Sequence, residues 1–425
     1  MFPLGCNFSM RRRSGLLARC LLLASLSGVG WAQSLPEGSW RFIVSGDSRN
    51  CGDIVIPAIA EKSAPLKPSF YWHLGDLRAI YKIDEDIAFN NAHDGRPLSC
   101  ESYHRLAWSD FISNQIGAFG DLPIYVGIGN HETILPKDEA AFRREFDAWL
   151  DQPTLRSQRK LDKEPAQPEP YYHWIQGGVD FIYLDNASDC FSPAQMLWFT
   201  HRVEAAKKNP EVKSVVVGMH EALPDSFASN HSMGDKKEET ESYETGHKVY
   251  MTLEALNKTK RVYVLASHSH FYMENIFATP TLKAIGTPLK GWIVGTAGAQ
   301  RYAPPPGISA APSQPILDTY GYAVGTVSAV GEIEFSFQPI QESDVPQYVR
   351  QRYAAKALPF CFNENSLNKD PKEADQTQLC PSRRVAKCGS KPAQRNASRM
   401  WPGDDFLSPI RPAPFPRPAP PPVLC

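Results

Sequence analysis

The chain has 425 residues, with 45 basic and 46 acidic side chains and a formal net charge of −1. This balance lacks the basic excess with which proteins usually neutralise nucleic-acid phosphates, so no nucleic-acid partner is expected. Hydrophobic residues make up 42% of the chain and aromatic residues 11%, which excludes a wholly disordered protein.

The N-terminus has the parts of a secretory signal. Three arginines at 11–13 precede an apolar run at 20–29, and the small residues Gly30 and Ala32 occupy the positions that a signal peptidase inspects. The run is too short for a stable membrane span, so residues 1–32 are predicted to be a cleaved signal peptide. The mature protein is then exported to the periplasm or the medium, without a membrane span. The alternative is an uncleaved N-terminal anchor.

Apolar, β-rich runs alternate with helical stretches along the middle of the chain. The predicted strands span residues 40–45, 70–74, 124–128, 179–184, 214–218 and 261–266, and strand-like segments follow at 291–297 and 321–337. The predicted helices span residues 53–62, 103–116, 136–150, 193–208 and 247–256, the fourth with Ser192 as its N-cap. This alternation predicts an α/β protein with a layered sheet and helices outside.

Polar residues follow most of these strands in short turns. The turns read GDSR at 46–49, GD at 75–76, GNHE at 129–132, MHE at 219–221 and SHSH at 267–270. Since ligands gather at the carboxyl ends of strands in open α/β sheets, these turns predict a metal cage. Its oxygen and imidazole donors suit two borderline cations, Mn, Fe or Zn, rather than Ca.

Two such cations suit the hydrolysis of a phosphoester. They bind its negatively charged oxygens, acidify a bridging water and stabilise the in-line displacement. The ordered set GDxR, GD, GNHE, a lone histidine after a strand and HxH resembles the calcineurin-like metallophosphoesterase superfamily, which includes the purple acid phosphatases. The resemblance covers about residues 38–340 and implies a layered β-sandwich flanked by helices.

The resemblance also implies a role for each motif residue. His131 would contact the phosphoryl group and protonate the leaving oxygen or stabilise its charge. The implied metal ligands are Asp47 and His270 for one ion, Asp76 bridging both, and Asn130, His220 and His268 for the second.

The sequence departs from the family pattern at two positions. Arg49 stands where many members have a histidine, and a guanidinium cannot ligate a cation. Either the first metal keeps a water there, or Arg49 binds the substrate phosphate, which its fork geometry fits. Purple acid phosphatases carry a tyrosine three residues after the second Asp. Here that residue is Ala79 and Tyr81 is out of register, so no tyrosine–iron colour is expected.

The loop at 224–246 follows His220 directly. This position makes His231 and Ser232 candidate substrate contacts, whereas the lysines and glutamates of the loop favour a solvated surface. Glu132 and Glu221 each follow a family histidine and either orient an imidazole or serve as ion-pair partners.

The C-terminal composition changes from about residue 345. Residues 364–399 are polar and 401–425 contain nine prolines, which favours extended polyproline conformations. Residues 346–425 are therefore predicted to be a largely disordered tail, and 36–345 the catalytic domain. The tail is either a spacer or a ligand for a proline-recognition domain.

Seven cysteines remain of nine once the signal removes Cys6 and Cys20. An odd number leaves one thiol unpaired or shared between chains, and that thiol is expected in the tail. Cys361 and Cys380 flank a polar loop and are predicted to pair with each other.

The sequence thus predicts an exported metallophosphoesterase in which a metal-bridging hydroxide attacks the phosphorus of a small phosphorylated substrate. It does not choose between monoesters and diesters. One alternative is a phosphoesterase-fold protein that Arg49 has weakened at one metal site and that binds a phosphorylated ligand without turnover. Another is an envelope interaction protein that acts through the proline-rich tail.

Overall fold

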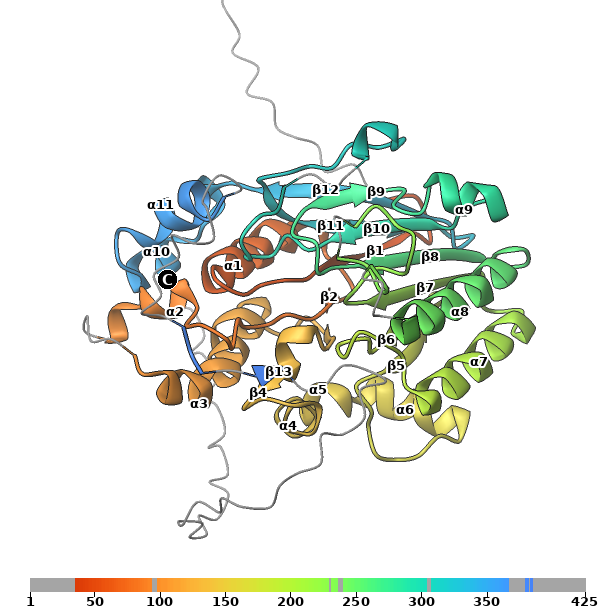
Figure 1. Ribbon diagram of the computed structural model, residues 1–425, viewed down its shortest axis with the longest axis horizontal. Helices are drawn as coiled ribbons and strands as arrows, with labels where there is room; N and C mark the ends of the chain where they lie inside the picture. The colour runs from red at the N-terminus through yellow and green to blue at the C-terminus, as the bar shows by residue number, and fades with distance from the viewer. Residues whose placement is uncertain are drawn as a thin grey trace, which may run out of the picture.

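The computed structural model describes residues 35–93, 98–228, 231–235, 240–303, 307–366, 379–381 and 383–384. The predicted signal peptide and the proline-rich segment 401–425 lie outside these ranges. Within them, a five-stranded and a six-stranded sheet form the centre of the molecule, and helices cover the outside (Figure 1). The predicted α/β class, with layered sheets flanked by helices, is confirmed.

The first sheet has the order β12-β11-β1-β2-β3. Strands β1, β2 and β3 run parallel, while β11 is antiparallel to β1 and to β12. The parallel strands therefore end at one edge of the sheet, where three of the polar turns follow. The strands span Trp40–Ser45 (β1), Tyr71–His73 (β2), Ile124–Val126 (β3), Tyr320–Val327 (β11) and Ile333–Ile340 (β12).

The second sheet has the order β5-β6-β7-β8-β10-β9. Its four central strands run parallel, and β5 and β9 are antiparallel additions at the two edges. The strands span Tyr172–Gln176 (β5), Val179–Leu184 (β6), Ser214–Met219 (β7), Arg261–Ala266 (β8), Tyr272–Glu274 (β9) and Lys290–Val294 (β10).

Aromatic side chains fill the space between the sheets. The ring of Phe42 on β1 lies 5.1 Å from Phe181 on β6, and Phe70 lies 5.3 Å from Trp174 on β5. All four are fully buried, and burial of each such side chain contributes about 1.5–3 kcal/mol. This packing fixes the two sheets relative to each other and brings their carboxyl edges together.

Helices flank both sheets, and α7 begins where the sequence predicts. The Ser192 hydroxyl accepts a hydrogen bond from the Gln195 amide at 3.2 Å, as an N-cap does. The longer helices span Gly52–Ser63 (α1), Cys100–Asp110 (α3), Glu139–Glu145 (α4), Pro153–Asp162 (α6), Pro193–Lys208 (α7) and Thr240–Asn257 (α8). The shorter ones span Glu85–Ala88 (α2), Asp147–Leu150 (α5), Pro280–Ile285 (α9), Gln347–Arg352 (α10) and Ala357–Pro359 (α11).

Three predicted elements are divided in the structure. The predicted helix 103–116 ends as α3 at Asp110 and continues as π and 3-10 turns, and the predicted helix 136–150 splits at Phe146 into α4 and α5. The predicted strand 321–337 is the hairpin of β11 and β12, because Gly331 turns the chain with a φ of 76°. No helix within the described ranges has the length and apolar character to cross a bilayer.

The predicted boundary between domain and tail at residue 345 is wrong for residues 346–366. Helices α10 and α11 and the π-helix Phe360–Glu364 fold onto the first sheet's outer layer. Val349 and Tyr353 are buried there, and the Tyr353 hydroxyl donates to Asp53 on α1 at 3.1 Å. Residues 346–366 carry apolar side chains along their length, and these anchor the segment on the domain.

The predicted Cys361–Cys380 disulfide is also wrong. Cys361 is bonded to Cys51 and Cys380 to Cys100, across 310 and 280 residues of chain, and Cys190 is disulfide-bonded as well. The short separation of Cys361 and Cys380 in the sequence does not predict their pairing, because the true partners are brought together by the tertiary fold. Cys388 and Cys425 lie outside the described residues, so an unpaired thiol in the tail stays a prediction.

Removing the Cys51–Cys361 bond should lower the free energy of unfolding by about 2–5 kcal/mol, because the bond closes a very long loop. Denaturant titration of Cys51→Ala, Cys361→Ala and the double variant measures this. Each single variant should cost as much as the double, since either one removes the bond. A double variant as stable as the parent would show that residues 357–364 are not held to the domain in this way.

Candidate metal centre

The six predicted metal ligands lie together where the two sheets present their carboxyl ends. All are buried or nearly so, and each follows the strand from which the sequence predicts it. Asp47 follows β1, Asp76 follows β2, Asn130 follows β3, His220 follows β7, and His268 and His270 follow β8.

The turns that carry these ligands have strained, tightly fixed backbones. Asp47, Asp76 and His268 have φ angles of 59°, 59° and 63°, a region that costs a non-glycine residue about 1–3 kcal/mol. The first two turns hydrogen-bond to each other, since the Asp47 amide donates to the Gly75 carbonyl at 3.0 Å. A Cβ at Gly129 would lie 2.4 Å from Asp76 Oδ1, so the GNHE turn requires glycine there.

The first group of ligand atoms belongs to Asp47, Asp76 and His270, and these atoms all lie within 4.8 Å of one another. His270 donates from Nδ1 to the Gln300 carbonyl, which leaves the Nε2 lone pair facing Asp47 Oδ1 at 3.3 Å. Asp47 Oδ1 is buried and accepts no hydrogen bond from the described residues. A buried carboxylate oxygen of this kind fits a cation.

The second group consists of Asp76, His220 and His268. His220 donates from Nδ1 to the Leu74 carbonyl at 3.0 Å, so its Nε2 faces the site. That nitrogen lies 3.2 Å from Asp76 Oδ1, 3.1 Å from Asn130 Oδ1 and 3.0 Å from His268 Nδ1. Four atoms with lone pairs thus converge on one point, which is the donor arrangement of a borderline cation.

The electrostatics of the two groups favour positive charge. Burial alone would lower the pKa of His220, but the carboxylates of Asp76 and Asp47 outweigh it and raise that pKa to about 9. Burial likewise opposes ionisation of Asp76, yet His131, His220 and Arg49 hold its pKa well below the usual value. The residues therefore fit two cations that share Asp76.

Glu132 fixes the turns around Asp76. Its carboxylate accepts hydrogen bonds from the amides of Asp76 at 2.9 Å, Leu77 at 3.0 Å and Gly129 at 2.8 Å. Burial and the neighbouring Asp76 raise the Glu132 pKa to about 8. Glu132 thus holds the backbone of two ligand turns rather than an imidazole.

Glu221 lies near the outer nitrogen of His268, with its Oε1 3.8 Å from His268 Nε2, on the side of that ring away from the second ligand group. Burial and the neighbouring histidines hold the pKa of His268 well below its usual value, so the ring is neutral and the contact is not an ion pair. Of the two roles that the sequence left open for Glu221, the described residues show neither a hydrogen bond that orients His268 nor an ion pair with it.

The two predicted catalytic residues line a cavity of about 380 Å3 beside the ligand groups. His131 donates from Nδ1 to the Ala79 carbonyl at 2.6 Å, and its Nε2 lies 3.5 Å from Asp76 Oδ2. Arg49 is buried, with Nη2 at 3.0 Å from His270 Nε2 and Nε at 3.5 Å from Asp76 Oδ2. The other lining residues are Tyr81, Ile134, His270, Gln300 and Tyr302.

The two candidate substrate contacts of the 224–246 loop differ. His231 Nδ1 lies 3.3 Å from His268 Nε2, which places this ring behind a ligand of the second group. The Ser232 hydroxyl donates to Asp235 within its own turn, and Ser232 does not line the cavity. The structure therefore brings His231 to the site and leaves Ser232 outside it.

Tyr302 is the site residue that the sequence did not reveal. Its ring stacks on His270 at 3.9 Å and on His231 at 4.6 Å, and its hydroxyl accepts from Arg49 at 3.4 Å. Burial raises the Tyr302 pKa to about 12, so the phenol stays protonated. Tyr302 follows the glycine-containing turn after β10, and this repeat of the pattern at the other strand ends is the signal that could have found it.

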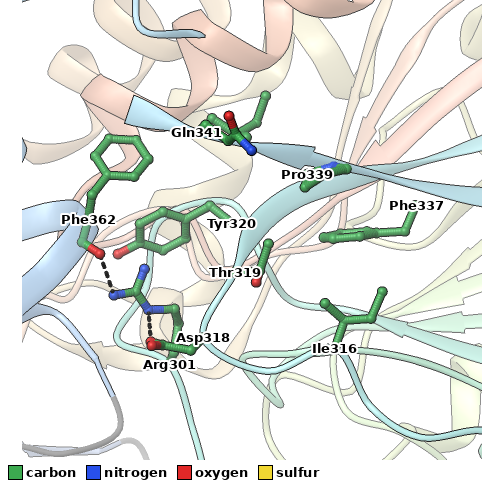
Figure 2. Close-up of a pocket in the computed structure, with 10 residues that line it drawn as sticks. Arg301, Ile316, Asp318, Thr319, Tyr320, Phe337, Pro339, Gln341 and Phe362 are labelled. Atoms are coloured by element: carbon green, nitrogen blue, oxygen red, sulfur yellow. Dashed lines mark hydrogen bonds and ion pairs between the residues drawn. The ribbon is translucent and has the colours of Figure 1, made fainter. Parts of the chain in front are cut away.

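Arg301 anchors the segment that carries Gln300 and Tyr302 (Figure 2). Its Nε lies 2.8 Å from Asp318 Oδ1, its Nη2 donates to the Phe362 carbonyl at 3.4 Å, and its guanidinium stacks 4.5 Å from the Tyr320 ring. Arg301 lines a second cavity of about 510 Å3, whereas its two neighbours line the metal-side cavity. Residue 362, predicted to belong to the tail, thus helps to position Tyr302.

A third group of ligand-type side chains, Asp162, Glu164 and His173, is an ion-pair network. Arg202 Nη1 lies 2.7 Å from Asp162 Oδ1, and its Nε lies 3.4 Å from Glu164 Oε1. The guanidinium supplies the positive charge that a metal would bring, so this group is not a candidate metal site.

Comparison with known proteins finds likeness only among solved structures. No family model and no curated protein matches the sequence. The chain is similar to a purple acid phosphatase from yellow lupin (Lupinus luteus) seeds, at 14% identity and a TM-score of 0.49, over 78% of this chain and 57% of that one. It is similar to PhoD, at 16% identity and a TM-score of 0.45, over 71% and 72%. It is also similar to a dimetal phosphatase from Danio rerio, at 9% identity and a TM-score of 0.41, over 71% and 95%.

This chain spans 57% of the lupin chain's length.

Replacing Glu132 by Gln should weaken metal binding by about 10- to 100-fold, the usual cost of losing an outer partner of a metal site. The amide has one acceptor oxygen in place of two and cannot accept all three backbone hydrogen bonds. Competition with a chromophoric chelator measures the affinity. Glu101→Gln, at an exposed position on α3, is the matched control and should leave it unchanged. Equal affinities for the two variants would refute the positioning role.

Proposed function

We propose that this protein is a phosphoesterase that uses two metal ions, Mn, Fe or Zn, bound by the two ligand groups that share Asp76. The single observation that carries the proposal is this sharing. Asp47 and His270 form one group with the Asp76 carboxylate, His220 and His268 form the other, and a cavity lined by Arg49, His131 and His270 lies beside them. The substrate is a small phosphate ester.

The metals and the chain have separate tasks in this proposal. When bound, two cations neutralise the phosphoryl oxygens and generate a nucleophile from water. The chain supplies Arg49, whose guanidinium matches two phosphoryl oxygens and is positioned by its contact with the Tyr302 hydroxyl. The His270 lone pair that Arg49 now contacts is the one that faces the first ligand group. With His270 holding a cation through this lone pair, the Arg49 guanidinium would be available to bind phosphoryl oxygens in the cavity.

His131 is positioned to protonate the leaving oxygen. Because Nδ1–H is committed to the Ala79 carbonyl, the proton that the ring gives up comes from Nε2, on the cavity side. This Nε2 lies 3.5 Å from Asp76 Oδ2, which places the ring beside the shared carboxylate, where the reacting phosphoryl group would lie. Proton donation of this kind contributes about 100- to 10,000-fold to a rate.

A second candidate function keeps the fold without turnover. Arg49 stands where a further ligand would complete the first group, and its Nη2 lies 3.0 Å from His270 Nε2. A chain that binds one metal at the second group and holds a phosphorylated ligand through Arg49 would use the same residues. Metal content and turnover separate the two candidates.

We further propose that the protein works outside the cytoplasm. The signal-like N-terminus and the disulfides Cys51–Cys361 and Cys100–Cys380 support this, since such bonds persist in oxidising compartments.

The purified chain, reconstituted with Mn, should hydrolyse a generic aryl phosphate. His131→Ala should lower kcat by about 100- to 10,000-fold, because no other group delivers the proton. Arg49→Lys should raise KM more than it lowers kcat, because a point charge replaces a fork that binds two oxygens. His201→Ala, at an exposed position on α7, is the control and should retain full activity. One bound ion per chain and no turnover on a panel of esters would favour the second candidate function.

A further inference from the structure

The residues that line the cavity beside the metal ligands differ in chemistry. Arg49, His270 and Tyr302 present cationic and polar groups, where phosphoryl oxygens would lie. The Tyr81 ring and Ile134 present apolar surface next to His131, whose ring lies 5.4 Å from that of Tyr81, while the Tyr81 hydroxyl interacts electrostatically with Arg49. Since the proposed proton donor faces the leaving oxygen, this apolar surface lies on the leaving-group side.

We propose that Tyr81 and Ile134 form a leaving-group wall that selects phosphate esters of aromatic or extended apolar alcohols. This inference rests on the proposed function. At about 30 Å3 for each water-sized group, the cavity of about 380 Å3 holds roughly a dozen non-hydrogen atoms, more than a phosphate group fills. The remaining space borders an aromatic ring and an aliphatic side chain, surfaces that favour an aryl or alkyl group.

The residue before Tyr81 has a strained backbone conformation. Ile80 has a φ of 61°, which is a clear outlier for a β-branched residue. Two hydrogen bonds hold it there: its amide is paired with the Tyr103 hydroxyl at 3.0 Å and its carbonyl with His104 Nε2 at 3.0 Å. Strain that neighbouring groups enforce in this way marks functional positions.

A C-terminal strap, defined as residues 379–381 and 383–384, fixes both wall residues. The Cys380 amide donates to the Tyr81 carbonyl at 2.8 Å, and Leu379 bridges to Lys82. Strand β13 (Arg383–Arg384) pairs with β4 (Ile134–Leu135), and Figure 1 shows the two side by side. The Cys100–Cys380 disulfide ties the strap to α3. One short segment thus braces Tyr81 and Ile134, the two cavity-lining residues nearest to it in the structure's strand pairing and backbone hydrogen bonds.

The apolar wall is continuous with a hydrophobic cluster beneath it. Ile134 and Cys380 are buried members of this cluster, and Tyr81 packs against it. The wall is therefore rigid, and a ligand group that meets it gains contact area without ordering loose side chains.

Two phosphonates that cannot be hydrolysed test the inference without turnover. Calorimetric titration of the metal-loaded full chain should show 2-phenylethylphosphonate binding about 10- to 50-fold more tightly than ethylphosphonate, from the added apolar area. In turnover, 2-phenylethyl phosphate and ethyl phosphate have leaving alcohols of similar acidity, so a difference in kcat/KM reports the wall rather than leaving-group chemistry. The same preference is expected there.

Variants show which residues cause the preference for the phenyl compound. Tyr81→Ala should reduce the ratio of the two affinities to about threefold or less, and Tyr81→Phe should keep it, since the ring provides the contact. Cys100→Ala with Cys380→Ala should weaken the preference while the number of bound metals is unchanged. Tyr348→Ala, at a half-exposed tyrosine on α10, is the matched control and should keep the ratio.

The outcomes separate this inference from the proposed function. Equal binding of both phosphonates by the parent chain overturns the leaving-group wall, whatever the variants do. Retention of the full preference by a folded Tyr81→Ala also overturns it. Preference for the phenyl compound without hydrolysis of any ester supports the wall and contradicts the phosphoesterase proposal. Hydrolysis of both esters with equal kcat/KM supports the phosphoesterase proposal and contradicts the leaving-group wall.

Discussion

The burial of two carboxylates at one point is the constraint on which the structure of the site depends. Asp47 and Asp76 have no exposed surface, and taking an ionised carboxylate out of water costs several kcal/mol even after the protein relaxes. Only nearby positive charge offsets such a cost. His220 and Arg49 supply part of it, and the arrangement of lone pairs toward two points leaves the rest to cations.

This constraint explains why several distant parts of the chain converge on the site. The strained turns at Asp47 and Asp76 hold each other through backbone hydrogen bonds, and Glu132 fixes the second of them. The C-terminal region adds two braces. The Cys51–Cys361 bond closes on the residues just after the first turn, and the Phe362 carbonyl holds Arg301 next to Tyr302. The buried carboxylates keep their positions although their charges repel each other, because hydrogen bonds and a disulfide from separate elements hold the turns that carry them.

The sequence predicts that these side chains meet, because the pattern that carries them is local. Each ligand follows an apolar run that ends in a short polar turn, and parallel strands bring such turns to one edge without further information. Asp47, Asp76, Asn130 and the three histidines are found together for this reason. Strand ends at Ser45, Leu184 and Ala266 also follow directly from the limits of the apolar runs.

What the sequence does not predict depends on contacts between distant segments. The true disulfide partners are separated by 310 and 280 residues, so the nearer pairing of Cys361 with Cys380 had no local feature against it. Residues 346–366 adjoin the polar stretch that begins at 364, but they contain apolar side chains of their own, and Val349, Tyr353 and Cys361 find apolar partners on the domain. Tyr302 and the wall formed by Tyr81 and Ile134 can be identified only in the folded structure, where these residues line one cavity.

The claim that two metal ions share Asp76 is tested most directly by counting the ions bound to the parent chain, to Asp76→Asn and to Asp47→Asn. Elemental analysis and calorimetric titration measure these numbers. Sharing of Asp76 predicts two ions in the parent, a loss of affinity at both sites in Asp76→Asn, and one remaining ion in Asp47→Asn. Equal losses in the two variants, or a parent that binds one ion and is indifferent to Asp76→Asn, would contradict it.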